Sequence, residues 1–238
     1  MRDTLSETSN VIAARRGLQF LAARPKTRMV GLGLFYGAPG LGKTSYIEKV
    51  ATENKGWLLI RLESSDTAKT FLQRLYLRIA AERGMAAEYP GGSTNSVHRL
   101  VVDLLRDQAM TIFVDEIDYA FSNKKLLGVI RDLVDETLSE VILVGMQDAH
   151  KRLLRANAHY FDRCNYFVKF KALDVNDVRL VLSDMCEVAI DDSLAVHLHK
   201  DTGGTLRRLV KKVHVIETIA RKHGISRVTK KMFLRDVA

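Results

Sequence analysis

Residues 37–45 read GAPGLGKTS, a glycine-rich stretch whose residue types and spacing suit the binding of nucleotide phosphates. Every required position of the P-loop pattern G-x-x-x-x-G-K-[ST] is filled. Small residues let backbone N–H groups wrap the phosphates, while Lys43 would reach the β- and γ-phosphates and the Thr44 hydroxyl would bind Mg²⁺. The pattern predicts ATP and Mg²⁺ as cofactors, held by Gly37, Ala38, Pro39, Gly40, Leu41, Gly42, Lys43, Thr44 and Ser45.

A second stretch, TIFVDEID at 111–118, brings two adjacent carboxylates to the end of an apolar run. Open α/β sheets bind their ligands at the carboxyl ends of strands, so Asp115 is expected to hold the Mg²⁺ through water. Glu116 would polarise a water for attack on the γ-phosphate. An Asp-Glu pair is often only a capped loop, but here it ends a strand 72 residues after Lys43. The two stretches together predict ATP hydrolysis, and not binding alone.

The elements that must position these residues alternate between strand and helix patterns. Apolar runs predict strands at 30–36, 56–62, 110–115, 140–145 and 166–170. Helical patterns are expected at 8–24, 43–53, 67–83, 95–107, 124–137, 175–186, 191–200, 204–223 and 229–237. The alternation predicts an α/β fold with a doubly wound, parallel five-stranded sheet, followed by a small all-helical lid without strands. The expected domains are an ATPase core with an N-terminal helix at 1–172 and a basic helical subdomain at 173–238.

The charge is concentrated near the end of the chain. Residues 195–238 hold 11 Lys and Arg against 3 acids, a balance of +8 within a total of +9. One interpretation is a solvated helical face, and the other is a surface that binds a polyanion such as DNA. Charge runs alone leave the two interpretations equally weighted.

Composition narrows the class of protein. No apolar stretch approaches the roughly 18 residues of a membrane span, and the first residues lack the apolar core of a signal peptide. Cys164 and Cys186 show no metal-ligand spacing and are expected to be free thiols in a reducing compartment. These features favour a cytoplasmic protein.

The order of these motifs resembles that of the AAA+ ATPases: GAPGLGKT, VDEID, the strand VILVG, then a helical tail with GGTLRR. The resemblance implies a polar sensor after the fourth strand, where the usual Asn or Thr is absent and Gln147 is the candidate; an ordinary turn is the alternative. It implies an arginine finger acting on a neighbouring subunit, for which Arg163 is the candidate and Arg152 and Arg155 are alternates; a surface salt bridge is the alternative role. Arg207 would be the second sensor, reaching the γ-phosphate; a solvated helix residue is the alternative.

Within that family, the chain looks most like the small AAA+ transposition ATPases, the group that contains the B protein of bacteriophage Mu. The shared features are TSNV ahead of the P-loop strand, TIFVDEID, LVGMQDAHKRLLR and a short basic helical tail. This resemblance implies an oligomer that forms on DNA with ATP, delivers target DNA to a transposase and has its ATP hydrolysis stimulated by that transposase. A phage-encoded member would act in the cytoplasm of a bacterial host.

Binding to the DNA backbone would need exposed cations rather than base-stacking aromatics, which are scarce at 7%. The candidates for DNA contact are Lys69, Arg74, Arg78, Lys124, Lys125, Lys211, Lys212, Lys230 and Lys231. Two other functions fit the same motifs. One is a replication initiator or loader with a helicase partner, and the other is a nucleotide-gated regulator that binds a protein and not DNA.

Overall fold

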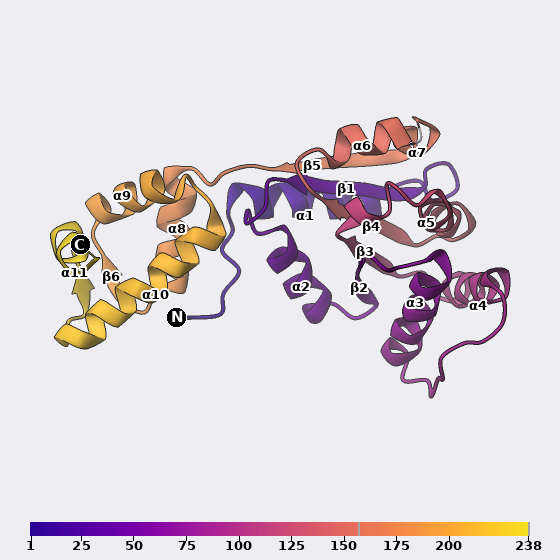
Figure 1. Ribbon diagram of the computed structural model, residues 1–238, viewed down its shortest axis with the longest axis horizontal. Coiled ribbons are helices and arrows are strands. Elements are labelled where there is room, and N and C mark those ends of the chain that lie inside the picture. Colours follow the sequence, from indigo (N-terminus) through magenta and orange to yellow (C-terminus); the bar gives the residue numbers. More distant parts are fainter. Residues whose placement is uncertain (157, 238) are drawn as a thin grey trace. The chain divides into compact units, whose positions relative to one another are not determined.

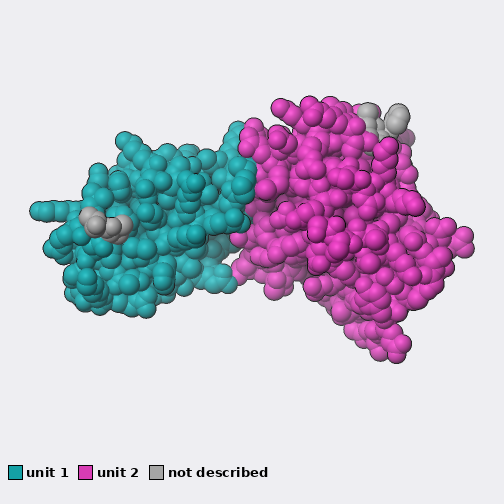
Figure 2. Space-filling model, in the orientation of Figure 1, with its two compact units in different colours: residues 1–15, 38–42, 170–238 teal, residues 16–37, 43–169 magenta. Residues whose placement is uncertain are grey.

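The computed structural model describes residues 1–156 and 158–237. Its contacts divide the chain into two compact units, coloured separately in Figure 2. The sheet unit comprises residues 16–37 and 43–169, and the helical unit comprises residues 1–15, 38–42 and 170–238. Each unit has its own apolar core. The predicted domains, 1–172 and 173–238, remain a prediction. The compact units differ from them in grouping residues 1–15 and 38–42 with residues 170–238.

The sheet unit is built on five strands in the order β2-β3-β4-β1-β5 (Figure 1). The strands are β1 Gly31–Gly37, β2 Trp57–Arg61, β3 Thr111–Asp115, β4 Glu140–Gly145 and β5 Cys164–Phe170. Parallel ladders join β1 to β4, β4 to β3 and β3 to β2. The predicted five-stranded parallel sheet is confirmed, and its carboxyl edge collects the ends of β1, β3 and β4.

Helices cover both faces of this sheet. They are α1 Ser9–Ala22, α2 Lys43–Glu53, α3 Ala68–Glu82, α4 Thr94–Asp107, α5 Lys124–Glu136, α6 Ala149–Ala156 and α7 Ala158–Asp162. Leu32 and Leu34 of β1 join a core with α3, α4 and α5, whereas Phe35 contacts Tyr46 of α2 on the opposite face. Alternate strand residues point to opposite faces, which explains why β1 is apolar throughout. The helices α6 and α7 were not predicted.

The start of α3 shows how local sequence fixes a helix boundary. Thr67 and Thr70 form a capping box, in which each side-chain hydroxyl accepts a hydrogen bond from the other residue's backbone N–H. Phe71, Leu72 and Leu75 then follow at helical spacing and are fully buried, as that spacing predicts.

The helical unit contains α8 Val175–Met185, α9 Asp192–Thr202, α10 Leu206–His223 and α11 Lys230–Val237. It also contains two short strands, β6 Ala189–Ile190 and β7 Arg227–Val228, which pair in parallel. The expectation of a lid without strands is therefore wrong. A two-residue strand shows no alternation over the four to eight residues that a strand pattern needs.

Both cysteines are free and buried, in agreement with the sequence. Burial raises the pKa of the Cys164 thiol to about 12, so this group stays protonated and unreactive at neutral pH. Among the described residues, no helix combines the length and the apolar character needed to cross a bilayer.

Two neighbouring glycines provide a stability test for the helical unit. Gly203 and Gly204 both have positive φ, of 60° and 67°. A Cβ on Gly203 would meet nothing within 4 Å, whereas one on Gly204 would lie 2.3 Å from the Leu173 carbonyl oxygen. We expect Gly203→Ala to cost about 1–2 kcal/mol for its left-handed backbone alone. Gly204→Ala should cost a further 1–3 kcal/mol or so, because the backbone must shift. Denaturant unfolding of both variants measures the difference, and equal costs would contradict the packing at Leu173.

Candidate nucleotide-binding site

The P-loop adopts a backbone that requires glycine at two positions. Gly40 and Gly42 have φ of 78° and 93°, a region that residues with a Cβ rarely adopt. A Cβ on Gly42 would also lie 2.7 Å from the Leu206 side chain, within the helical unit. In the same unit, the backbone N–H of Arg207 donates to the carbonyl oxygen of Gly40 at 3.0 Å. Arg207 thus lies beside the loop, in the first turn of α10, and its side chain is exposed. Its role as a second sensor stays a prediction.

In the sheet unit, Lys43 is the first residue of α2 and is only 8% exposed. Its ammonium group donates to the carbonyl oxygen of Gly37, the last residue of β1, at 2.7 Å. This bond holds the positive charge at the carboxyl edge of the sheet, next to a helix N-terminus whose free N–H groups favour anions. The arrangement suits a phosphate group.

Thr44 and Asp115, the two residues that the sequence assigns to Mg²⁺, are in contact in the structure. The Thr44 hydroxyl donates to Asp115 Oδ2 at 3.1 Å, and Asp115 is 3% exposed. A hydroxyl and a carboxylate supply the hard oxygen ligands that Mg²⁺ takes together with phosphate oxygens and waters. Among the described residues there is no group of three or more His, Cys, Asp and Glu that would bind a metal alone. The donors therefore fit a Mg²⁺ that arrives with a nucleotide.

Glu116 has an unusual backbone. Its φ of 56° and ψ of 40° make it the one non-glycine residue with positive φ in the described part of the chain. Such a conformation costs about 1–2 kcal/mol and persists where surrounding contacts enforce it. The Glu116 N–H donates to Asp115 Oδ1 at 3.0 Å, which holds the turn at the end of β3. The strain is therefore located at the residue predicted to activate water.

The turn after β4 contains Gln147, the candidate first sensor. Gln147 is exposed. The turn is anchored instead by Asp118, whose Oδ2 accepts the Met146 N–H at 2.7 Å. A Cβ on Gly145 would lie 2.9 Å from the same oxygen, so the two strand ends pack closely here. Whether Gln147 positions water stays a prediction.

Arg152 completes this anchor, although sequence reasoning considered it only as an alternate arginine finger. Its guanidinium donates to Asp118 Oδ1 at 2.7 Å and to the Asp118 carbonyl oxygen at 3.1 Å. The same guanidinium lies over the Phe121 ring, 4.8 Å from its centroid. Within the chain, Arg152 therefore stabilises the turn that carries Glu116 and the turn that carries Gln147.

The other finger candidates lie in different surroundings. Arg163 is 40% exposed and its Nε donates to Asp135 Oδ1 at 3.0 Å, which is the surface salt bridge of the alternative interpretation. Arg155 lies exposed in the last turn of α6. Action of either residue on a second subunit stays a prediction.

A positioning role for Arg152 gives a specific expectation for Arg152→Ala. Losing charge-assisted bonds of about 1.5–3 kcal/mol should loosen the two turns and lower kcat for ATP about tenfold or more. The affinity for ATP should stay nearly unchanged, because Lys43 and Thr44 are untouched. Steady-state kinetics with a separate binding measurement test this, using Lys151→Ala on the exposed side of α6 as the control. Equal kcat losses in both variants would contradict the role.

The DNA-contact candidates are dispersed over both units. Lys124, Lys125, Arg78, Lys211 and Lys231 are exposed, while Lys69 and Lys230 are half-buried. Two others already have partners within the chain. Arg74 pairs with Asp66 at 2.7 Å, and Lys212 pairs with Asp201 at 2.8 Å and lies over Phe233.

Sequence reasoning missed Asp118 and Arg61 as site residues. The Arg61 guanidinium lies 3.3 Å from Asp115 Oδ2 and 3.0 Å from Glu48. Both residues lie at strand ends: Arg61 is the last residue of β2, and Asp118 lies just after the end of β3. Polar residues at strand ends were thus the available signal.

With this geometry in place, comparison with known proteins defines the family. The sequence profile described as the AAA domain matches residues 27–153, which include the P-loop, Asp115, Glu116 and the end of β4. The match covers more than half of the chain, so the protein belongs to the AAA domain family. No curated protein matches the sequence.

Solved structures share the fold at low sequence identity. The chain is similar to the ORC2 protein of Aeropyrum pernix, determined in ADPNP–ADP complexes, with a TM-score of 0.73 and 14% identity over 98% of this chain and 69% of that one. The ORC1 protein of the same organism in complex with DNA gives a TM-score of 0.66 and 17% identity, covering 98% and 65%. RuvB of Thermotoga maritima, a Holliday junction branch migration motor, gives 0.60 and 17%, covering 96% and 68%. The chain thus spans about two thirds of each.

Proposed function

We propose that this AAA protein hydrolyses ATP and uses its nucleotide state to control binding to duplex DNA. The observation that carries the ATPase part is the Thr44–Asp115 contact at 3.1 Å, with Lys43 fixed on Gly37 and Glu116 next in sequence. This arrangement supports the proposal, because a lysine ammonium, a hydroxyl and two adjacent carboxylates come from the carboxyl edge of the sheet.

The proposed roles follow from this chemistry. Lys43 and the N–H groups of the P-loop bind and orient the phosphates. Thr44 and Asp115 would hold Mg²⁺, which neutralises charge on the β- and γ-phosphates when bound. Glu116 accepts a proton from the attacking water, while Asp118 and Arg152 keep its turn in place. Arg207 and Arg163 are proposed to contact the γ-phosphate, Arg163 from a second copy of the chain.

Within this activity, target selection for DNA transposition is the proposed biological role. The support is the resemblance of TIFVDEID, LVGMQDAHKRLLR and the basic tail to the small AAA+ transposition ATPases. ATP bound by successive subunits would assemble an oligomer on DNA, and hydrolysis would release it. Such an oligomer would deliver DNA to a transposase, which would stimulate hydrolysis in return. Binding would be largely independent of sequence, because the candidate residues are cations suited to phosphates.

The likeness to the ORC structures favours a second candidate, a replication initiator or loader. Both candidates predict binding of ATP and DNA, and they differ in the partner. Pull-down with a helicase and with a transposase would distinguish them. A regulator that binds only protein becomes the preferred function if duplex DNA is not bound at low salt.

A double charge reversal tests DNA binding by the helical unit. Lys211 and Lys231 are exposed on α10 and α11. The variant Lys211→Glu/Lys231→Glu should weaken binding to random duplex at least tenfold at low salt. The slope of log affinity against log salt should fall by about two, because each lost phosphate contact removes roughly 0.9.

The matched control reverses two exposed lysines of the sheet unit, Lys55 and Lys151, which gives the same change in net charge. Fluorescence anisotropy with ATP measures both variants. Equal losses of affinity would mean that only the overall charge matters, and the helical unit would then not be the DNA-binding surface.

A further inference from the structure

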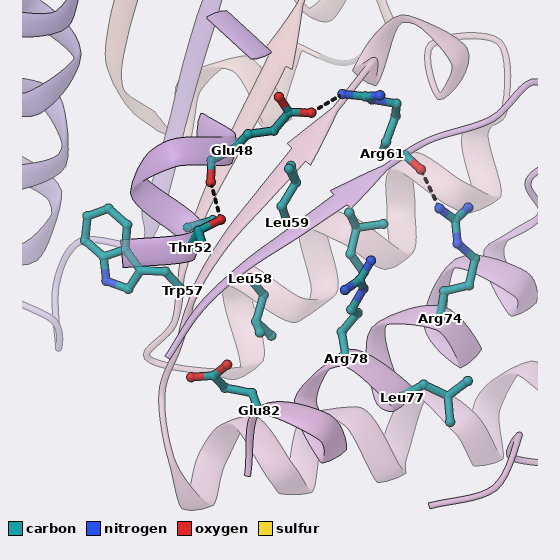
Figure 3. Close-up of a pocket in the computed structure, with 12 residues that line it drawn as sticks. Glu48, Thr52, Trp57, Leu58, Leu59, Arg61, Arg74, Leu77, Arg78 and Glu82 are labelled. Atoms are coloured by element: carbon teal, nitrogen blue, oxygen red, sulfur yellow. Dashed lines mark hydrogen bonds and ion pairs between the residues drawn. The ribbon is translucent and has the colours of Figure 1, made fainter. Parts of the chain in front are cut away.

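A groove lies along the outer side of β2, between α2 and α3 of the sheet unit (Figure 3). Its volume is about 640 Å³, within the range of ligand-binding pockets. Trp57, Leu59 and Leu77 contribute apolar surface, and Arg78 extends into it from α3. Because β2 is an edge strand of the sheet, this groove exposes the backbone of a strand that has only one neighbour.

The direction of the ladder bonds shows which backbone groups face the groove. The Thr111 N–H donates to the Gly56 carbonyl at one end of β2, and the Leu62 N–H donates to the Asp115 carbonyl at the other. Bonds alternate along a strand, so even-numbered residues of β2 face β3 and odd-numbered ones face outward. The N–H and carbonyl of Leu59 therefore point into the groove.

At both ends of β2, an outward-facing backbone group already has a hydrogen-bond partner within the chain. The Trp57 N–H donates to the Asn54 carbonyl at 3.2 Å, and the Arg61 carbonyl accepts from the Arg74 guanidinium at 2.6 Å. These bonds leave the middle of the edge, at Leu59, as the place where a short added strand would pair. A segment of a few residues fits this limit better than a long strand.

The charges in the groove favour a protein ligand over DNA. The guanidinium of Arg61 is paired with Glu48 and Asp115, and that of Arg74 with Asp66. Arg78 is exposed, so it offers a cation to a ligand. Glu48 and Glu82 line the same groove and would repel a continuous phosphate backbone.

We propose that this groove binds an extended peptide segment of a partner protein, which adds to the edge of β2 and places a carboxylate against Arg78. Backbone bonds at Leu59 would supply part of the affinity, and Trp57 and Leu77 would contact alternate apolar side chains. Arg61, which lines the groove, also contacts Asp115, so the docking surface borders the nucleotide site. The proposal goes beyond the ATPase function, and its test needs no nucleotide, so either can fail alone.

The chain contains a single tryptophan, Trp57, so intrinsic fluorescence reports on the groove directly. The probe is a blocked pentapeptide with a central glutamate flanked on each side by serine and then valine, titrated into the full chain. We expect a saturable change in Trp57 emission with a Kd below about 1 mM. Replacing the glutamate by lysine should weaken binding at least tenfold. N-methylation of the alternate peptide amides that face β2 should weaken binding about tenfold, because their bonds to the strand are lost.

The variant Arg78→Glu should reverse the preference, binding the lysine peptide better than the glutamate peptide. Arg99→Glu, an exposed charge reversal on α4, is the matched control and should keep the original preference. The proposal is overturned if no peptide changes the emission, if both peptides bind alike, or if Arg78→Glu has no effect. Quenching of Trp57 by duplex DNA, lost in Arg78→Glu, would instead identify the groove as a nucleic-acid site.

Discussion

Replacing Glu116 by glutamine should lower kcat for ATP by a factor of roughly 10²–10⁴ while ATP binding persists, as expected when a general base is removed. The two side chains have the same shape, so the left-handed turn at Glu116 and its bond to Asp115 can remain. A chain that binds ATP without hydrolysing it should stay on DNA. The variant is therefore expected to form long-lived complexes with duplex DNA in the presence of ATP.

The control for this result is Glu53→Gln, an exposed carboxylate in the last turn of α2. It should hydrolyse ATP at the wild-type rate. Phosphate release at saturating ATP and a separate measurement of ATP affinity give the two quantities needed. Hydrolysis by Glu116→Gln within a few-fold of wild type would show that another group activates the water.

The second large effect is expected at Lys43. Hydrogen bonds to charged groups contribute about 1.5–3 kcal/mol, so Lys43→Ala should weaken ATP binding about 10- to 100-fold. Lys43 is nearly buried and bonded to Gly37, so its ammonium is already held where phosphates are expected. The variant should therefore lose ATP-dependent DNA binding and hydrolysis together.

Calorimetric titration with ATP measures this loss. Lys49→Ala, a half-exposed lysine on the same helix, is the matched control and should bind ATP normally. Thermal unfolding of both variants shows whether the fold is retained. Unchanged ATP affinity in a folded Lys43→Ala variant would contradict the assignment of the P-loop.

The sheet was predictable because its signals are local and long. Each of the five strands is an apolar run of several residues, and the P-loop lies between one such run and a helical pattern. The carboxylate at the end of β3 could be placed near the P-loop because parallel strands bring their carboxyl ends to one edge. The contact between Thr44 and Asp115 follows from that rule.

Other features depend on contacts that the sequence does not display. Asp118 and Arg152 are 34 residues apart, and their pairing requires β3 and β4 to be neighbours in the sheet. The strands β6 and β7 are too short to show alternation. Partners within the chain, such as Asp66 for Arg74, decide which basic residues remain available to a ligand, and charge counting cannot reveal them.

The most direct test of the central claim is the affinity for random-sequence duplex DNA with ATP, with ADP and without nucleotide, over a range of salt concentrations. Fluorescence anisotropy with the wild-type chain measures it. The account predicts tight binding with ATP, weaker binding in the other two states, and a steep loss of affinity with salt. Binding that is equal in all three nucleotide states, or absent at low salt, would contradict an ATP-controlled DNA-binding function.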